Sequence, residues 1–227
     1  MTIKEVTRKL LALIEKELKA FDFKLDLKEQ GFLREENGVI YFYFFLIYNE
    51  HNIKTGAKGF LIEPYAKISN LSIEKYYKKI TINSYLKSKW DFNTIGNSLA
   101  NLIANPDGIN RKRNESLRFY VWEEAHIKLV ANALLKLFKE FALLYFLENS
   151  SVKRIDMLLN SHPREYTVHM VNDLFRFVKG VIAAKLDNNP ESDNLLTIYN
   201  TLIDERDMPD DCRIEMKRLA DMLPEIK

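Results

Sequence analysis

The stretch FLREENGVIYFYFFLIY, residues 32–48, decides the fold class of this 227-residue chain. Residues 32–34 and 39–48 are rich in aromatic and aliphatic side chains that favour strands, and Asn37-Gly38 between them favours a tight turn. The sequence therefore predicts a β-hairpin. Because its second strand is apolar on both faces, we expect that strand in the middle of a sheet, with other elements packed on each face or with its outer face at an interface.

The residues after the hairpin extend the sheet. Residues 51–59 turn the chain, and residues 60–68 return as a third strand. Pro64 in this strand marks a bulge or an edge, because proline cannot donate a ladder hydrogen bond. In residues 72–92 a helical spacing of apolar side chains competes with a strand-like alternation, so we divide this segment between a helix and a strand.

Helix signals stand on both sides of these strands. Thr2 and Glu5 have the spacing of a capping box and begin a first helix that runs to about Ala20. Residues 93–104 begin with Asn-Thr, a pair that can cap a helix, and are predicted to be helical. Residues 117–121 then alternate as a further strand.

The second half of the chain is predicted to be helical. From residue 123 to residue 147, apolar side chains recur at three- and four-residue steps, which indicates a long and largely buried helix. A second helix has its apolar face on residues 168–182, and shorter helices are predicted at residues 191–203 and 210–222.

This order of elements predicts an α+β fold, because runs of strands are followed by runs of helices. The expected architecture is an N-terminal helix plus an antiparallel sheet, followed by an α-helical C-terminal half. We place the sheet-containing part in residues 1–149 and the helical part in residues 150–227, packed on the first part as one unit.

Composition indicates a globular protein of a reducing compartment. The chain is 47% hydrophobic and contains one cysteine, Cys212, which has no partner for an intramolecular disulfide. The longest unbroken apolar run, residues 39–48, is much shorter than the roughly 18 residues that a membrane-spanning helix needs. We therefore expect a cytoplasmic protein without a membrane partner.

Charge is distributed unevenly along the chain. Residues 54–89 contain eight lysines and two acidic residues, whereas residues 187–227 contain eleven acidic and five basic residues. The two segments can attract one another or face different partners. Whether the acidic tail docks on the basic segment is left open by the sequence.

No catalytic motif is recognisable in the sequence, and we predict no catalytic, cofactor-binding or metal-binding residues. The weak candidates for a polar site are Glu123, His126 and Arg164. A carboxylate one helical turn from His126 can orient its imidazole, but Glu123 near a helix start is also explained by the helix dipole.

Two further residues are interpreted as structural. His169 shares a helical stripe with Arg176 and Lys179, which is the pattern of a solvated helix face. Cys212 falls with Met216 on the apolar stripe of the last helix and is interpreted as a small core residue.

The densest basic cluster consists of Arg111, Lys112, Arg113 and Arg118, next to three aromatic residues, Phe119, Tyr120 and Trp122. Cations that meet phosphates and aromatic faces that stack on bases are both features of nucleic-acid binders, so these residues are possible nucleic-acid or partner contacts. A solvated loop is the competing interpretation, because the net charge of the chain is only +2.

The order of segments resembles uncharacterised bacterial families that have only a domain-of-unknown-function label. The similar features are LKEQGFLREENGVIYFYFFLIY (27–48), TIGNSLANLI (94–103), FLENSSVKRIDMLLN (146–160) and FRFVKGVIAAKL (175–186). The resemblance implies an N-terminal helix, an antiparallel sheet and a helical C-terminal half. It also implies a role in bacterial toxin neutralisation or defence, and it supplies no functional residue.

The sequence favours a non-catalytic protein-interaction module, because it combines an aromatic central strand and uneven charge with no catalytic motif. A nucleic-acid-binding protein that uses the basic loop 111–118 is one alternative. A hydrolase or transferase with a dispersed site is another, and a deep polar pocket would be its first sign. The expected partner is another protein, and the oligomeric state stays open.

Overall fold

The structure is a computed structural model that describes residues 1–83 and 93–227. Six strands of these residues form one sheet in the order β1-β2-β3-β4-β5, with β6 also paired to β4, and all pairings are antiparallel. The strands are Lys24–Asp26 (β1), Gly31–Glu36 (β2), Val39–His51 (β3), Lys58–Asn70 (β4), Ile95–Ser98 (β5) and Phe119–Val121 (β6). Together with the helices, this sheet confirms the predicted α+β class.

The hairpin of β2 and β3 has the turn that the sequence predicts. Asn37 and Gly38 have positive φ angles of 50° and 75°, as a two-residue hairpin turn of type I′ requires. β3 lies in the middle of the sheet, between β2 and β4, as predicted. All 13 of its residues pair with β4.

Pro64 lies at a gap in the pairing of β4 and not at a bulge. On one side it is directly opposite Phe45 in the continuous register of β3 and β4. On the other side, β6 pairs with residues 60–62 and β5 with residues 65–68, so Glu63 and Pro64 face neither strand. Because no ladder bond is required there, a residue without an N–H group is tolerated.

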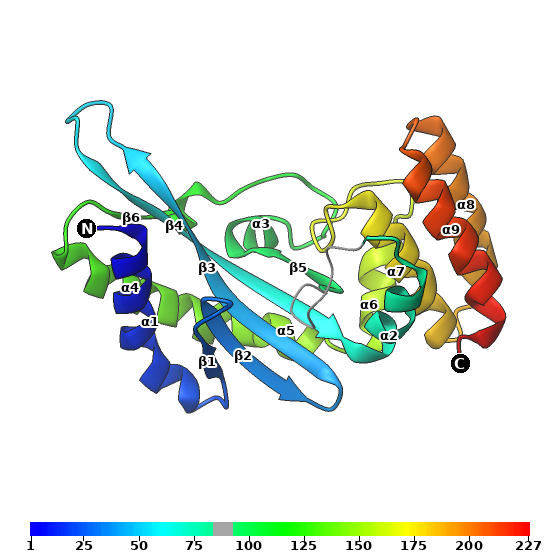
Figure 1. The fold of residues 1–227 in the computed structure, drawn as a ribbon, viewed down its shortest axis with the longest axis horizontal. Helices are drawn as coiled ribbons and strands as arrows, with labels where there is room; N and C mark the ends of the chain where they lie inside the picture. Colours follow the sequence, from blue (N-terminus) through cyan, green and yellow to red (C-terminus); the bar gives the residue numbers. More distant parts are fainter. Residues whose placement is uncertain (84–92) are drawn as a thin grey trace.

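Helices α1, α4 and α5 cover one face of the sheet (Figure 1). The predicted capping box of Thr2 and Glu5 begins α1. Helix α4 is bonded to the sheet, because the Tyr43 hydroxyl on β3 donates a 2.8 Å hydrogen bond to the carbonyl of Leu134. A π-helical turn joins α4 to α5 within the long helix that the sequence predicts. The bounds are Ile3–Lys19 (α1), Ala125–Leu137 (α4), Phe138–Ala142 (the π turn, η2) and Leu143–Asn149 (α5).

The segment after β4 confirms one prediction and corrects another. Helix α2, Leu71–Ile80, confirms the helical half of the ambiguous segment, whereas most of its strand half falls outside the described residues. Residues 93–94 do not cap a helix, because they lead into β5, and Ser98 caps the shorter helix α3, Leu99–Ala104. Thr94 is held away from a capping role, because its hydroxyl donates to Glu74 at 2.6 Å.

The C-terminal helices gather with α2 at one end of the sheet (Figure 1). Val168 is not part of the predicted second helix, because α7 begins only after Asn172, whose side chain caps it. The elements are Glu115–Leu117 (η1), Val152–Asn160 (α6), Asp173–Leu186 (α7), Ser192–Glu205 (α8), Asp210–Met222 (α9) and Leu223–Glu225 (η3).

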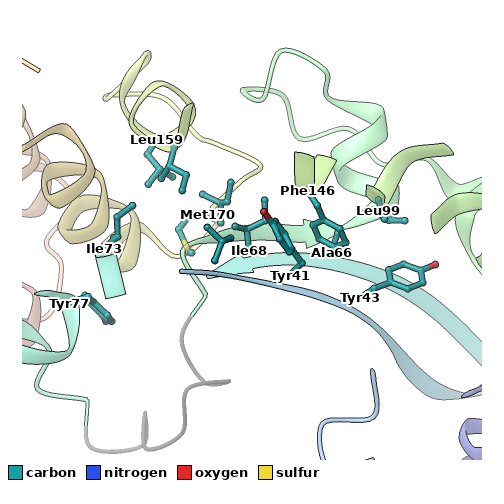
Figure 2. Close-up of a cluster of buried hydrophobic side chains, with 14 of the residues drawn as sticks. Tyr41, Tyr43, Ala66, Ile68, Ile73, Tyr77, Leu99, Phe146, Leu159 and Met170 are labelled. Carbon is teal, nitrogen blue, oxygen red and sulfur yellow. The ribbon is translucent and has the colours of Figure 1, made fainter. Parts of the chain in front are cut away.

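One hydrophobic core extends from the sheet into the C-terminal helices. Figure 2 shows Tyr41 and Ile68 of the sheet in the same cluster as Phe146 of α5 and Leu159 of α6. Met170, from the connection between α6 and α7, lies between these groups in the picture and is buried. The sheet-containing and helical parts therefore share their core.

The acidic tail docks on the C-terminal end of α2. The buried carboxylate of Glu215 on α9 accepts hydrogen bonds from the Thr81 hydroxyl at 2.7 Å and from the Ile82 N–H at 2.9 Å. Arg218 donates to the carbonyl of Ile80 at 3.3 Å. The contact therefore uses specific hydrogen bonds in addition to any attraction between the net charges of the segments.

Among residues 1–83 and 93–227, no helix is both long enough and apolar enough to cross a bilayer.

Candidate functional site

A polar pocket of about 350 Å³ lies where four segments meet. Its walls come from residues 105–109, from the C-terminal end of α5, from α6 and from residues 161–169, which connect α6 to α7. Twelve of its 18 lining residues have polar or charged side chains. A pocket in which polar groups converge is the most informative place to look for a ligand site.

His169 and Tyr145 form one wall of the pocket. The Tyr145 hydroxyl oxygen lies 3.2 Å from His169 Nδ1, and the two rings are nearly parallel, with centroids 5.8 Å apart. The N–H of Gly96 in β5 donates to the carbonyl of His169 at 2.7 Å, so the sheet fixes the histidine backbone. A Cβ atom on Gly108 would lie 3.2 Å from His169 Nε2, so glycine leaves space beside that nitrogen.

The protonation states of this pair follow from burial. Burial and, to a smaller extent, the nearby positive charge of Arg154 together lower the pKa of His169 to about 4. Burial raises the pKa of the Tyr145 hydroxyl well above its ordinary value. At neutral pH the pair is therefore a neutral imidazole and a protonated phenol, and no group of the described residues bonds His169 Nε2.

Arg154 places a positive charge beside this pair. Its Nε donates to Asn149 Oδ1 at 3.0 Å, and one terminal nitrogen lies 3.8 Å from the sulfur of Met157. No carboxylate of the described residues forms an ion pair with it. The guanidinium therefore keeps hydrogen-bond donors for a ligand.

Arg176 fixes the loop that follows α6 and lines the pocket. Its side chain is buried, and its three nitrogens donate to the backbone carbonyls of Leu159, His162 and Glu165. These carbonyls belong to the end of α6 and to the loop that follows it. A single buried guanidinium thus fixes the loop from which His162 and Tyr166 reach the pocket.

Acidic and aromatic residues stand at the rim. The Asp107 carboxylate accepts hydrogen bonds from the Asn110 side chain and the Ile109 N–H, so it is occupied within its own loop. Glu148 is exposed and lines the pocket from α5. Arg111 lies over the ring of Tyr166, 4.5 Å from its centroid, and adds a third guanidinium near the rim.

The burial of His169 predicts a specific loss of stability in acid. Folded His169 stays neutral down to about pH 4, whereas the unfolded chain protonates it near pH 6.5. Its contribution to stability is therefore complete above pH 6.5 and is lost as the pH falls toward 4. At about 1.4 kcal/mol per pKa unit, this loss reaches about 3 kcal/mol in the free energy of unfolding measured by urea denaturation.

His169→Asn is the control for this prediction, because asparagine can replace Nδ1 as the partner of Tyr145 without titrating. All other titrating groups are shared by the two proteins. We expect the stability of the variant to depend less on pH between 6.5 and 4. Equal losses of stability in the two proteins over this interval would contradict the assignment.

The structure corrects the interpretation of the stripe that includes His169. His169, Arg176 and Lys179 were expected on a solvated helix face, but all three are buried. His169 precedes α7 and is not helical, while Arg176 and Lys179 face inward because each has polar partners in the interior. Sequence periodicity cannot distinguish a solvated polar face from a buried one whose partners lie far along the chain.

Lys179 belongs to a second buried polar cluster, between α2 and α7. Its Nζ donates to Glu74 Oε1 at 2.9 Å and to the carbonyl of Asn93 at 2.7 Å. Burial lowers the pKa of Lys179, and the charge of Glu74 opposes that shift. The other Glu74 oxygen is buried without a hydrogen-bond partner in the described residues.

The basic loop is largely engaged in contacts within the protein. The carboxylate of Glu63, at the gap in β4, forms ion pairs with Arg113 and, at 3.7 Å, with Arg118. Arg118 also pairs with Glu115 at 3.1 Å. The backbone N–H of Lys112 donates to Asn105 Oδ1, and its side chain is exposed. Two of the four predicted cations are thus neutralised by acidic neighbours.

The three weak polar-site candidates do not meet in one place. His126 Nε2 lies 3.5 Å from Glu123, and His126 Nδ1 accepts the N–H of Trp122 at 3.2 Å, so this histidine closes the start of α4. Arg164 pairs with Glu205 at 3.1 Å on the surface. None of the three candidates lines the polar pocket.

Cys212 is buried on α9, consistent with its interpretation as a core residue, and burial raises the pKa of its thiol. Within the described residues, no three His, Cys, Asp or Glu side chains are grouped so that they can hold a metal ion. Comparison of the chain with models of protein families, with curated proteins and with solved structures finds no match.

Proposed function

We propose that the protein binds a small molecule with a phosphate or carboxylate group in the pocket of Arg154 and His169. The observation that carries this proposal is the guanidinium of Arg154, which borders a polar pocket and has no carboxylate partner among the described residues. A guanidinium matches the geometry of a phosphate or carboxylate and can bond it with two N–H groups.

Neighbouring groups favour the same ligand class. Arg176 adds a second positive charge that pairs with carbonyls and not with an acid. His169 Nε2 and the Tyr145 hydroxyl supply neutral hydrogen-bonding groups beside Arg154. Positive charge in a partly closed pocket attracts anions more strongly than the same charge on an open surface does.

Removing the charge of Arg154 tests the proposal. We expect Arg154→Gln to weaken the binding of inorganic phosphate or acetate by about 10- to 100-fold, because charge-assisted hydrogen bonds contribute about 1.5–3 kcal/mol. Binding is measured by titration of the anion against the imidazole NMR signals of the protein. The signal of His169 should move saturably, while those of His51 and His126, which lie outside the pocket, change little.

Arg213→Gln is the matched control, because it removes the same charge from an exposed arginine of α9 that pairs with Asp204 and Asp210. This variant should bind the anion as the unmodified chain does. The proposal is wrong if neither anion moves the His169 signal saturably, or if the two variants lose affinity equally.

The predicted protein-interaction module stays a prediction, because binding of a small anion does not exclude a protein partner. Such a partner requires an exposed apolar surface. Residues suited to such a surface are the large exposed apolar side chains of α4, η2 and α5, which are Leu129, Phe141, Leu144 and Leu147.

A further inference from the structure

An apolar groove lies next to the polar pocket, along α5. It has a volume of about 310 Å³ and lies between α3 on one side and η2 and α5 on the other. The long helix contains its π turn at this place, and π turns within α-helices often occur at functional sites. The apolar lining consists of Leu99, Leu102, Ile103, Pro106, Phe141 and Leu144.

The groove and the pocket lie next to each other. They share five lining residues, which come from α3, from the turn that follows it and from α5. Tyr145 contributes to both, so the ring that contacts His169 also lines the end of the groove. The shared residues are Leu102, Pro106, Tyr145, Glu148 and Asn149.

Exposed apolar side chains line the groove on the α5 side. Phe141 is 41% exposed and Leu144 is 50% exposed. Covering such side chains with an apolar ligand removes their surface from water, which favours binding. Because the groove adjoins the pocket that Arg154 and His169 line, the occupant should combine an apolar chain with a negative head group.

We infer that the pocket and the groove form one site for a single-chain anionic amphiphile, an alkyl chain that ends in a phosphate or a carboxylate. The head group bonds Arg154 and lies beside His169, while the chain follows α5 toward Phe141. This inference rests on the proposed anion site and adds the apolar part of the ligand. Glu148 lines both cavities, and its negative charge repels the head group. The head group should therefore lie away from Glu148 and toward Arg154.

Chain length is the decisive variable in the test. Affinities for methyl, hexyl and octyl phosphate, and for acetate, hexanoate and octanoate, are measured by calorimetry below the micelle-forming concentration. A fully buried methylene strengthens binding about fourfold. Because the groove is open on one side, the methylenes of the ligand are only partly buried, and we expect octyl phosphate to bind at least about tenfold more tightly than methyl phosphate. Comparison with the carboxylate series shows which head group is preferred.

Variants in the groove separate the apolar contribution from that of the head group. Leu144→Gln should remove most of the chain-length preference and leave methyl phosphate binding unchanged, and Phe141→Gln provides a second variant at the same wall. Leu129→Gln, an exposed leucine of α4 outside the groove, should change neither quantity. Arg154→Gln should weaken the binding of every chain length.

The outcomes distinguish the inference from the proposed function. If methyl phosphate binds at His169 and longer chains bind no more tightly, the amphiphile site is wrong and the anion site stands. If octyl phosphate binds more tightly but neither Leu144→Gln nor Phe141→Gln reduces that preference, the inference is also overturned. If no phosphate or carboxylate binds through Arg154, the proposed function itself fails.

Discussion

Lys179→Met is expected to lower the free energy of unfolding by about 3–5 kcal/mol, because it leaves the carboxylate of Glu74 buried without its cation. Both side chains of the pair are almost fully buried, at 2% and 1% exposure. The nearby carboxylate of Glu215 increases the cost, since its negative charge also acts at the Lys179 site. Urea denaturation at pH 7 measures the change.

The double variant Glu74→Gln, Lys179→Met is the control for this prediction. Glutamine carries no charge and keeps an oxygen that can accept the hydrogen bond that Thr94 donates to Glu74. Replacing a buried ion pair by neutral groups is often nearly neutral for stability, so the double variant should regain most of the loss. A double variant as unstable as Lys179→Met would show that packing, and not the unpaired charge, determines the cost.

Local sequence patterns predict the N-terminal half of the fold well. The helix that begins at Thr2 and the hairpin around Asn37-Gly38 depend on caps, on turn chemistry and on the alternation of side chains within a few residues. β5 is different, because its four residues include Gly96 with a φ of 147° and gain their stability from pairing with β4. A short strand of this kind has no local signal of its own.

The candidate site was missed because its residues are polar and come from distant segments. Arg176 and Lys179 look solvated in the sequence. Nothing local shows that backbone carbonyls near residue 160 will bond Arg176, or that Glu74 will pair with Lys179. His169 depends on Tyr145 from another helix. Two glycines are related to the position of His169. Gly96 donates to the His169 carbonyl, and Gly108 leaves space beside the His169 ring. One sequence does not reveal that these glycines and His169 are partners.

The candidate site and the stability of the C-terminal half both depend on hydrogen bonds made by buried, charged side chains of α7. Arg176 and Lys179 lie on one helix and connect it to two different parts of the chain, the loop 161–166 and the first turn of α2. Buried charges at these positions cost desolvation energy, which the hydrogen bonds must offset. They are therefore positions at which a conservative change has a large effect.

Arg176→Met is expected to lower the free energy of unfolding by about 3–5 kcal/mol, because three backbone carbonyls lose a charged donor. It should also weaken phosphate binding even at temperatures where the variant is folded, since the loop with His162 and Tyr166 loses its support. Urea denaturation measures the first effect, and the His169 NMR titration measures the second.

Arg206→Met is the matched control, because Arg206 donates to the carbonyl of Arg164 in the same loop but does so from the surface, where it also pairs with Asp173. Surface ion pairs contribute only about 0–1 kcal/mol, so this variant should be nearly as stable as the unmodified chain. If Arg176→Met costs no more than Arg206→Met and binds phosphate normally, the loop does not depend on the buried guanidinium. If it is destabilised but binds phosphate normally when folded, Arg176 supports the fold without shaping the pocket.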